Sequence, residues 1–194
     1  MTEEHISNPK FGLQLGTKAP IINSTDIFDQ NINTEEILQN HRGVIIDFFR
    51  GAWWYYWKIQ LSKFNAIVSE FDKRNVKLIT VASDKGRPLK KLAEKENYNF
   101  TVVPDPDVKI SKEYNVFGKP IDYEMIKVEL AIPSTFLINP KGEIVWRYIG
   151  TKTDRPKMET IISAIEEKLW INSTLMDDSS IKKRDVRWQP CPGL

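Results

Sequence analysis

The most distinctive chemistry in the sequence is carried by a run of five aromatic side chains: Trp53, Trp54, Tyr55, Tyr56 and Trp57. Several large aromatic residues on one surface of a soluble protein are unusual and often mark an interaction site. Such rings can stack on a flat ligand or enclose a cation, and they are enriched at the centres of protein interfaces. Arg50 and Arg155 are candidates for an added contact to an anion, although arginines also commonly lie in solvent.

Reactive sulfur is nearly absent, because the chain has one cysteine, Cys191, in a polar segment near its C-terminal end. A single cysteine cannot form an internal disulfide, so the sequence does not support a secreted, disulfide-stabilised domain. The flanking Pro190 and Pro192 would hold the thiol in an extended, accessible segment. Cys191 is therefore the one candidate catalytic residue, and the alternative is an ordinary surface cysteine.

Sites for metals, cofactors and phosphates are not indicated. The two histidines, His5 and His41, are far apart in the sequence and lack the spacing of a metal-binding pair. The sequence contains no glycine-rich phosphate loop. Asp105 and Asp107, which flank Pro106, are expected to form a turn and not an acid–base pair. We therefore expect no metal and no cofactor.

Composition and charge are those of a globular protein of ordinary size. The chain has 194 residues, of which 41% are hydrophobic and 28% charged, and its net charge is +2. Such a balanced charge does not predict binding to nucleic acid. No stretch approaches the roughly 18 consecutive apolar residues of a membrane span, and the polar, acidic residues 1–5 do not resemble a signal peptide. We expect a cytoplasmic protein with no nucleic-acid or membrane partner.

Periodicity predicts the two elements that would position the aromatic run. Residues 44–49, Val-Ile-Ile-Asp-Phe-Phe, are interpreted as a continuous apolar run and hence as a buried central strand. Apolar side chains then recur at three- and four-residue steps, which predicts a helix over 54–73. The aromatic run would therefore lie where this strand leads into this helix.

The remaining elements complete an α/β fold. Residues 76–81 and 100–103 are predicted strands with a helix after Pro88 between them, followed by a short helical piece over 108–114. The turn Asn139–Gly142 predicts a hairpin between strands over 135–138 and 143–148.

Two helix starts are read from capping signals: a short helix opened by Asn33 and a last helix from Asp154, with Pro156 in its first turn. The order of elements predicts a mixed central β-sheet flanked by helices on both faces, within a domain over 1–170 and followed by a tail over 171–194.

From residue 48 onward the sequence resembles the peroxiredoxin-like (AhpC/TSA, redoxin) branch of the thioredoxin-fold superfamily. Residues 48–53, Phe-Phe-Arg-Gly-Ala-Trp, match the connection that in this branch leads into Cys-Pro-Tyr-Cys, and Tyr56 and Gln60-Leu61 stand at the expected positions. Further matches follow in order along the chain: Gly16, Ala19 and Pro20, residues 81–84, residues 132–136 with Pro133 as a cis-proline, and residues 154–156. The resemblance covers about residues 11–169 and implies a thioredoxin-like fold that usually carries thiol-dependent peroxidase or disulfide-reductase activity.

The sequence departs from that branch at the residues that carry out its chemistry. Trp54 stands at the position of the first cysteine, Tyr55 at that of the proline and Trp57 at that of the second cysteine. A cysteine at a helix N-terminus is reactive because the helix stabilises its thiolate. An indole offers no comparable nucleophile, and tyrosine hydroxyls titrate near a pH of about 10. The resemblance therefore predicts a cysteine-less pseudoenzyme that binds or interacts.

Several interpretations remain open. The aromatic rings could simply pack together, form a homodimer or another protein interface, or bind a small molecule or peptide. The enzymatic alternative is a thiol-dependent oxidoreductase or peroxidase that uses Cys191 or a thiol of a partner. A further alternative is that Trp54 and Trp57 are not native, since one base separates cysteine and tryptophan codons; the change of proline to Tyr55 argues against a simple misreading.

Overall fold

A computed structural model describes residues 3–7, 9–51, 55–118, 130–151 and 153–170 of the chain. Of the residues singled out from the sequence, Trp53, Trp54 and Cys191 lie outside the described residues, as does the predicted tail over 171–194. No helix in the described ranges is long and apolar enough to cross a membrane.

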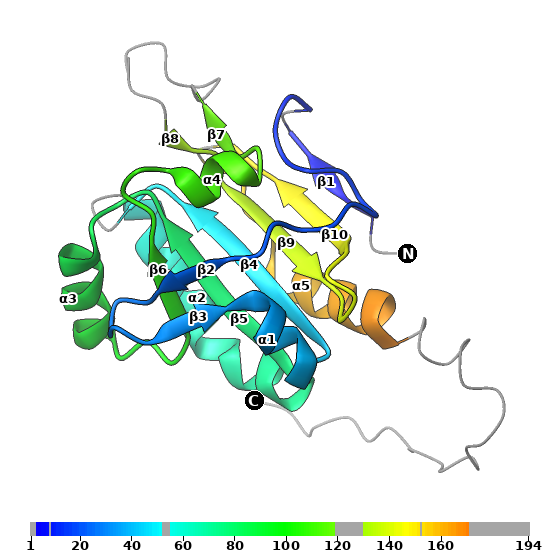
Figure 1. Cartoon of the computed structure of the whole chain (residues 1–194), viewed down its shortest axis with the longest axis horizontal. Coiled ribbons are helices and arrows are strands. Elements are labelled where there is room, and N and C mark those ends of the chain that lie inside the picture. Colours follow the sequence, from blue (N-terminus) through cyan, green and yellow to red (C-terminus); the bar gives the residue numbers. More distant parts are fainter. Residues whose placement is uncertain (1–2, 8, 52–54, 119–129, 152, 171–194) are drawn as a thin grey trace, which may run out of the picture.

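A mixed sheet of six strands forms the centre of the molecule, as predicted (Figure 1). Strands β4, β5 and β6 are parallel, whereas β9 runs antiparallel to both β4 and β10, and β1 is parallel to β10. From one edge to the other the strands are β1 (His5–Ile6), β10 (Ile144–Ile149), β9 (Ser134–Ile138), β4 (Gly43–Phe49), β5 (Val76–Ala82) and β6 (Thr101–Pro104).

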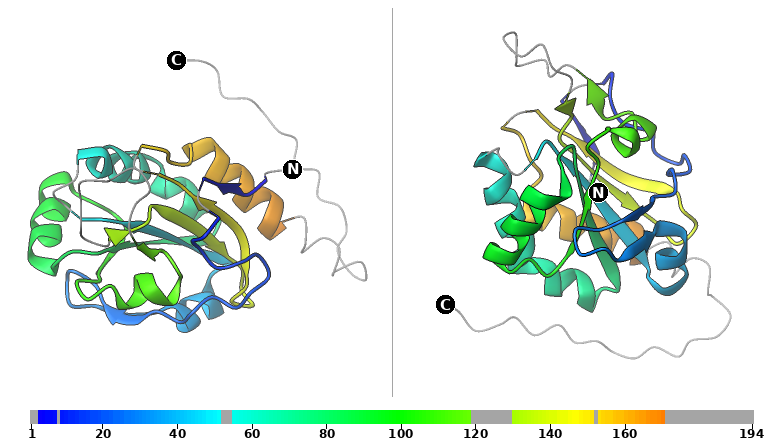
Figure 2. Two further views of the ribbon diagram at one scale, coloured as in Figure 1. Left: turned by 90° about the horizontal axis from the view of Figure 1, so that it is seen from above. Right: turned by 60° about the vertical axis from the view of Figure 1, so that its left-hand side comes forward.

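Helices cover both faces of this sheet, which confirms the predicted layering (Figure 2). The side chains of β4 alternate between the faces, because successive residues of a strand point in opposite directions. Ile45 and Phe49 belong to the core beneath α2 (Tyr55–Lys73), α3 (Gly86–Glu96) and α5 (Met158–Ile165). The opposite core contains Val44, Ile46 and Phe48 and is covered by α1 (Thr34–Asn40) and α4 (Lys109–Glu113).

Two small antiparallel ribbons lie outside the main sheet. Strand β2 (Asn23–Thr25) pairs with β3 (Asn31–Asn33), and β7 (Phe117–Gly118) pairs with β8 (Leu130–Ala131). The side chain of Asn33 accepts hydrogen bonds from the first turn of α1, so the predicted capping signal is confirmed.

Two helix starts differ from the prediction. Helix α3 begins at Gly86, so that Pro88 lies inside its first turn, where its missing N–H group costs nothing. Helix α5 begins at Met158, four residues after the predicted start at Asp154. The carboxylate of Asp154 does not cap α5, because it accepts hydrogen bonds from residues far away in the sequence, as described below.

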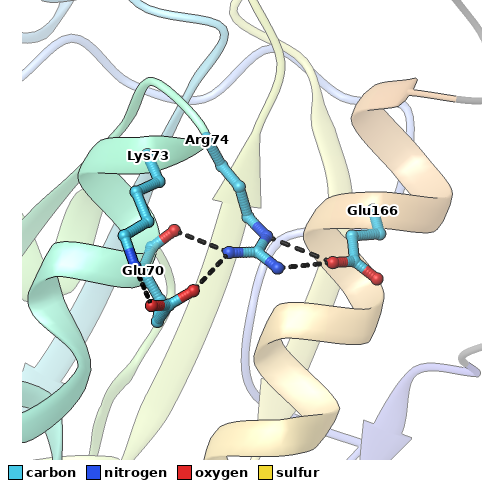
Figure 3. Close-up of polar contacts among 4 residues, drawn as sticks. All are labelled: Glu70, Lys73, Arg74 and Glu166. Carbon is cyan, nitrogen blue, oxygen red and sulfur yellow. Dashed lines mark hydrogen bonds and ion pairs between the residues drawn. The ribbon is translucent and has the colours of Figure 1, made fainter. Parts of the chain in front are cut away.

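The C-terminal end of α2 is tied to the end of α5 by charged side chains (Figure 3). A π-helical turn, Glu166–Trp170, continues α5 and presents Glu166 to Arg74, which follows α2. Arg74 donates to Glu166 Oε1 from Nη2 at 2.6 Å and to Glu70 Oε2 from Nη1 at 3.0 Å. Lys73 Nζ is a further 2.6 Å partner of Glu70. Ion pairs therefore connect the C-terminal end of α2 to the end of α5.

Candidate functional site

The candidate site lies where β4 leads into α2, at the opposite end of the α2 helix. Trp57, in the first turn of α2, is 1% exposed, and its ring centroid lies 4.8 Å from that of Phe49, the last residue of β4. The indole Nε1 is buried and has no hydrogen-bond acceptor among the described residues. Trp57 thus fills the core at the position where the resemblance placed the second cysteine.

Arg155 covers Trp57 from the loop that precedes α5. Its guanidinium carbon lies 4.6 Å from the centre of the Trp57 ring, a cation–π contact. Nη1 of Arg155 donates to the carbonyl oxygens of Thr151 and Asp154. Its Nε and Nη2 atoms are buried and find no acceptor in the described part of the chain. Only one nitrogen of this guanidinium is therefore satisfied.

Asp47 is a buried acid beside this cluster, on the face of β4 that points toward α2. Its side chain is 1% exposed, and Oδ1 accepts a hydrogen bond from Thr135 Oγ1 at 2.6 Å. Burial raises the pKa of Asp47 to about 7, and the Thr135 bond and the charge of Arg155 offset only part of that rise. Burial also lowers the pKa of Arg155 to about 10, although the charge of Asp47 opposes this change.

Arg50 follows β4 and is 1% exposed. Its Nε donates to the carbonyl oxygen of Ala131 at 3.4 Å, and its charge is close enough to Arg155 to lower the pKa of that residue further. Two guanidinium groups therefore share this end of the sheet with two carboxyls, Asp47 and Asp154, whose charges both act on Arg155. Because burial raises the pKa of Asp47 to about 7, positive charge predominates below that pH.

Pro133 is buried between β8 and β9, close to the Arg50 contact on Ala131. The prediction of a cis-proline here is wrong, since the described residues contain no cis peptide bond. The trans bond agrees with the ordinary preference of proline, and the carbonyl oxygen of Pro133 accepts a hydrogen bond from the Gly150 amide at 2.8 Å.

Asp154 fixes the loop that carries Arg155. Its carboxylate accepts from Tyr148 Oη at 2.5 Å and from Ser7 Oγ at 2.8 Å, and His5 Nε2 lies 2.7 Å away. The His5 ring also stacks on Tyr148 with centroids 4.3 Å apart. Burial alone would raise the pKa of Asp154, but these hydrogen bonds and the nearby His5 outweigh it, and the pKa lies below its usual value. Strand β1 thus helps to hold Arg155 over Trp57.

The structure brings together three of the residues expected from the sequence, namely Arg50, Trp57 and Arg155. Tyr55 and Tyr56 begin α2. The sequence interpretation missed Asp47, whose signal was a charged residue inside an otherwise apolar strand. It also missed Gln60 as a site residue: this side chain is 2% exposed and its Nε2 has no acceptor among the described residues.

The described part of the site contains no thiol and no metal-binding cluster. The described residues include no cysteine, and no group of three or more His, Cys, Asp or Glu side chains within them could hold a metal ion. Their charged and aromatic groups form cation–π and hydrogen-bond contacts, which are means of recognition.

Comparisons with known proteins bear on the identity of the chain. The AhpC/TSA family model matches residues 15–147. Peroxiredoxin Bcp from Xanthomonas campestris is 32% identical over 94 residues, which are 44% of this chain and only 54% of that protein. A putative peroxiredoxin bcp from Helicobacter pylori strain J99 is 26% identical over 130 residues, covering 67% of this chain and 84% of that protein. The crystal structure of peroxidoxin BcpB from Mycobacterium tuberculosis shares the fold, with a TM-score of 0.69 at 13% identity over 80% of this chain and 97% of that one.

Proposed function

The chain belongs to the AhpC/TSA family of peroxiredoxin-like proteins, and we propose that it is a member without thiol chemistry that acts as a binding or interaction module. The observation that carries this proposal is the position of Trp57. A peroxidatic or resolving thiol must meet its substrate or its partner thiol, and Trp57 presents a buried ring between Phe49 and Arg155 instead.

The charge around Trp57 also supports binding. In a thiol enzyme, nearby guanidinium groups would stabilise a thiolate and lower its pKa. Here Arg155 lies on an indole, Arg50 is close enough to act on Arg155, and the sequence places its one cysteine at position 191. The same positive charge suits an anionic ligand or an acidic side chain of a partner.

The aromatic run supplies the remaining part of the proposal. Burial of Trp57 favours the packing interpretation for its own ring. For Trp53 and Trp54 we propose contact with a partner, either a second copy of this chain or another protein, with a small-molecule or peptide ligand as the alternative.

Peroxide consumption by the full chain tests the proposal directly. With hydrogen peroxide and either thioredoxin or dithiothreitol as reductant, we expect a rate no higher than that of the reductant alone, because the described residues of the site include no thiol. An active peroxiredoxin assayed in parallel establishes that the conditions support turnover. Clear turnover that persists in Cys191→Ser would contradict the proposal.

The enzymatic alternative makes the opposite prediction in the same assay. If Cys191 serves as the nucleophile, turnover is present in the wild-type chain and is lost in Cys191→Ser. Rapid alkylation of the Cys191 thiol below its ordinary pKa of about 8.5 would give independent support to this alternative.

A further inference from the structure

A pocket of about 180 Å³ lies beside the candidate site, between α2 and the segment that leads into α5. Helix α2 contributes Gln60 and Lys63 to its lining, and the opposite wall contains Thr153, Arg155 and Lys157. A water molecule occupies about 30 Å³ in the liquid, so the pocket has room for a small polyatomic ion with some of its hydration.

The lining of this pocket is positively charged. Lys63, Arg155 and Lys157 are cationic, and none of the described residues that line it is acidic. Asp47 and Asp154 act on Arg155 from outside this lining, and Asp154 is held by Tyr148, Ser7 and His5. With three cations and no carboxylate among the described lining residues, the pocket favours an anion.

Two of the lining residues hold donors for which the described chain supplies no acceptor. Gln60 is 2% exposed, and its Nε2 is buried without a partner among the described residues. The same is true of Nε and Nη2 of Arg155. Buried donors are nearly always hydrogen-bonded in folded proteins, since leaving one unpaired costs stability. Two residues of this pocket therefore hold donors that an acceptor entering the pocket could satisfy.

The start of α5 adds to the same electrostatic preference. Pro156 and Lys157 line the pocket, and Lys157 is the N-cap of α5 without a side-chain hydrogen bond to the helix. The first N–H groups of a helix carry partial positive charge and readily accept an anion. Here this feature reinforces the buried donors of Gln60 and Arg155.

We propose that this pocket binds a small phosphate-type oxyanion, with Gln60 and Arg155 donating hydrogen bonds to its oxygens and Lys63 and Lys157 adding positive charge. The proposal concerns binding at this pocket alone, so it can be tested whether or not the protein has peroxidase activity. It also assigns a function to Arg155 beyond its contact with Trp57.

Thermal unfolding of the full chain with inorganic phosphate tests the proposal. We expect phosphate to raise the melting temperature with saturation, and chloride at matched ionic strength to raise it much less. Gln60→Leu replaces the amide by an apolar side chain of similar size and so removes the buried donor. It should weaken the apparent phosphate affinity about tenfold or more, as expected for loss of one hydrogen bond to a charged group.

Two further variants keep the test decisive. Lys63→Glu changes an exposed side chain, so the variant should fold normally and bind phosphate more weakly. If Gln60→Leu does not fold, the phosphate response of Lys63→Glu tests the proposal in its place. Arg74→Gln is the matched control, because it removes a cation from the other end of α2 and should leave the phosphate affinity unchanged. The proposal is overturned if chloride acts as strongly as phosphate, or if Lys63→Glu and Arg74→Gln alter the phosphate response equally.

Discussion

Arg74 and Arg155 lie at opposite ends of α2, and each links this helix to the segment around α5, yet their surroundings differ. At the C-terminal end, all three guanidinium nitrogens of Arg74 donate to Glu70 or Glu166 (Figure 3). At the N-terminal end, Arg155 rests on Trp57 with two nitrogens that have no acceptor among the described residues. Arg74 links α2 to the end of α5 through its hydrogen bonds, whereas Arg155 has two donor nitrogens without an acceptor among the described residues.

The difference separates contacts that build the fold from contacts that are available to a ligand. Glu166 is 56% exposed as a side chain, so water competes for its ion pair with Arg74 and limits its contribution to stability. Asp47 and Trp57 are each 1% exposed, so a charge or an unpaired donor there has a large effect. Substitutions at the two ends should therefore differ in size, in pH dependence and in salt dependence.

The largest effect is expected for Trp57→Ala. Removing a fully buried tryptophan leaves a cavity beneath Arg155 and should lower the free energy of unfolding by about 5 kcal/mol. Urea denaturation measures this change. Trp170→Ala is the matched control at the other end, since that ring is 44% exposed beneath Arg42, and it should cost less than about 1 kcal/mol. Equal losses in the two variants would remove the distinction between a buried and an accessible end.

Asp47→Asn should change how stability depends on pH. The pKa of Asp47 is about 7 in the folded protein and 3.8 without burial. Between these values the folded state binds more protons than the unfolded state, so the contribution of Asp47 to stability is complete below about pH 4 and is lost as pH rises toward 7. A shift of this size corresponds to about 4 kcal/mol.

The asparagine side chain remains neutral at every pH, so this loss should disappear in the variant. Urea denaturation of both proteins from pH 4.5 to 8 measures the free energy of unfolding. As pH rises, the variant should become more stable relative to the wild type by up to about 4 kcal/mol. Glu143→Gln is a suitable control, because the pKa of that partly exposed carboxyl is lowered instead, chiefly by a hydrogen bond from Asn139. If the free energy of unfolding changed with pH in the same way in the wild type and in Asp47→Asn, burial would not be raising the pKa of Asp47.

Much of the fold was predictable because its signals are local. The apolar runs of β4 and β5, the three- and four-residue spacing along α2 and the turn chemistry before β10 each lie within a short window of sequence. The start of α5 was not predictable in this way. Asp154 has the residue type of a helix cap, but its partners Ser7 and His5 are distant in sequence and meet it only after β1 pairs with β10.

The candidate site was predictable in part. Arg50, Trp57 and Arg155 followed from the resemblance to a family whose reactive cysteines lie at this position. The role of Gln60 was not visible, because a glutamine in a helix gives no sign of whether its amide will be buried without an acceptor. Asp47 could have been noticed, since a carboxylate inside a buried strand requires either a partner or a raised pKa.

The smallest effect is expected for Glu166→Gln, which removes one partner of Arg74. Arg74 keeps its bonds to Glu70, and the lost pair is exposed, so the free energy of unfolding should fall by about 0.5 kcal/mol in low salt. In about 1 M NaCl the difference from wild type should vanish, because the screening length there is only about 3 Å. Urea denaturation at both salt concentrations measures this. A loss of more than about 2 kcal/mol, or one that salt leaves unchanged, would mean that the Arg74 end is shielded from water as strongly as the Arg155 end. In that case the unpaired donors of Arg155, and not a difference in burial, would be what distinguishes the two ends of α2.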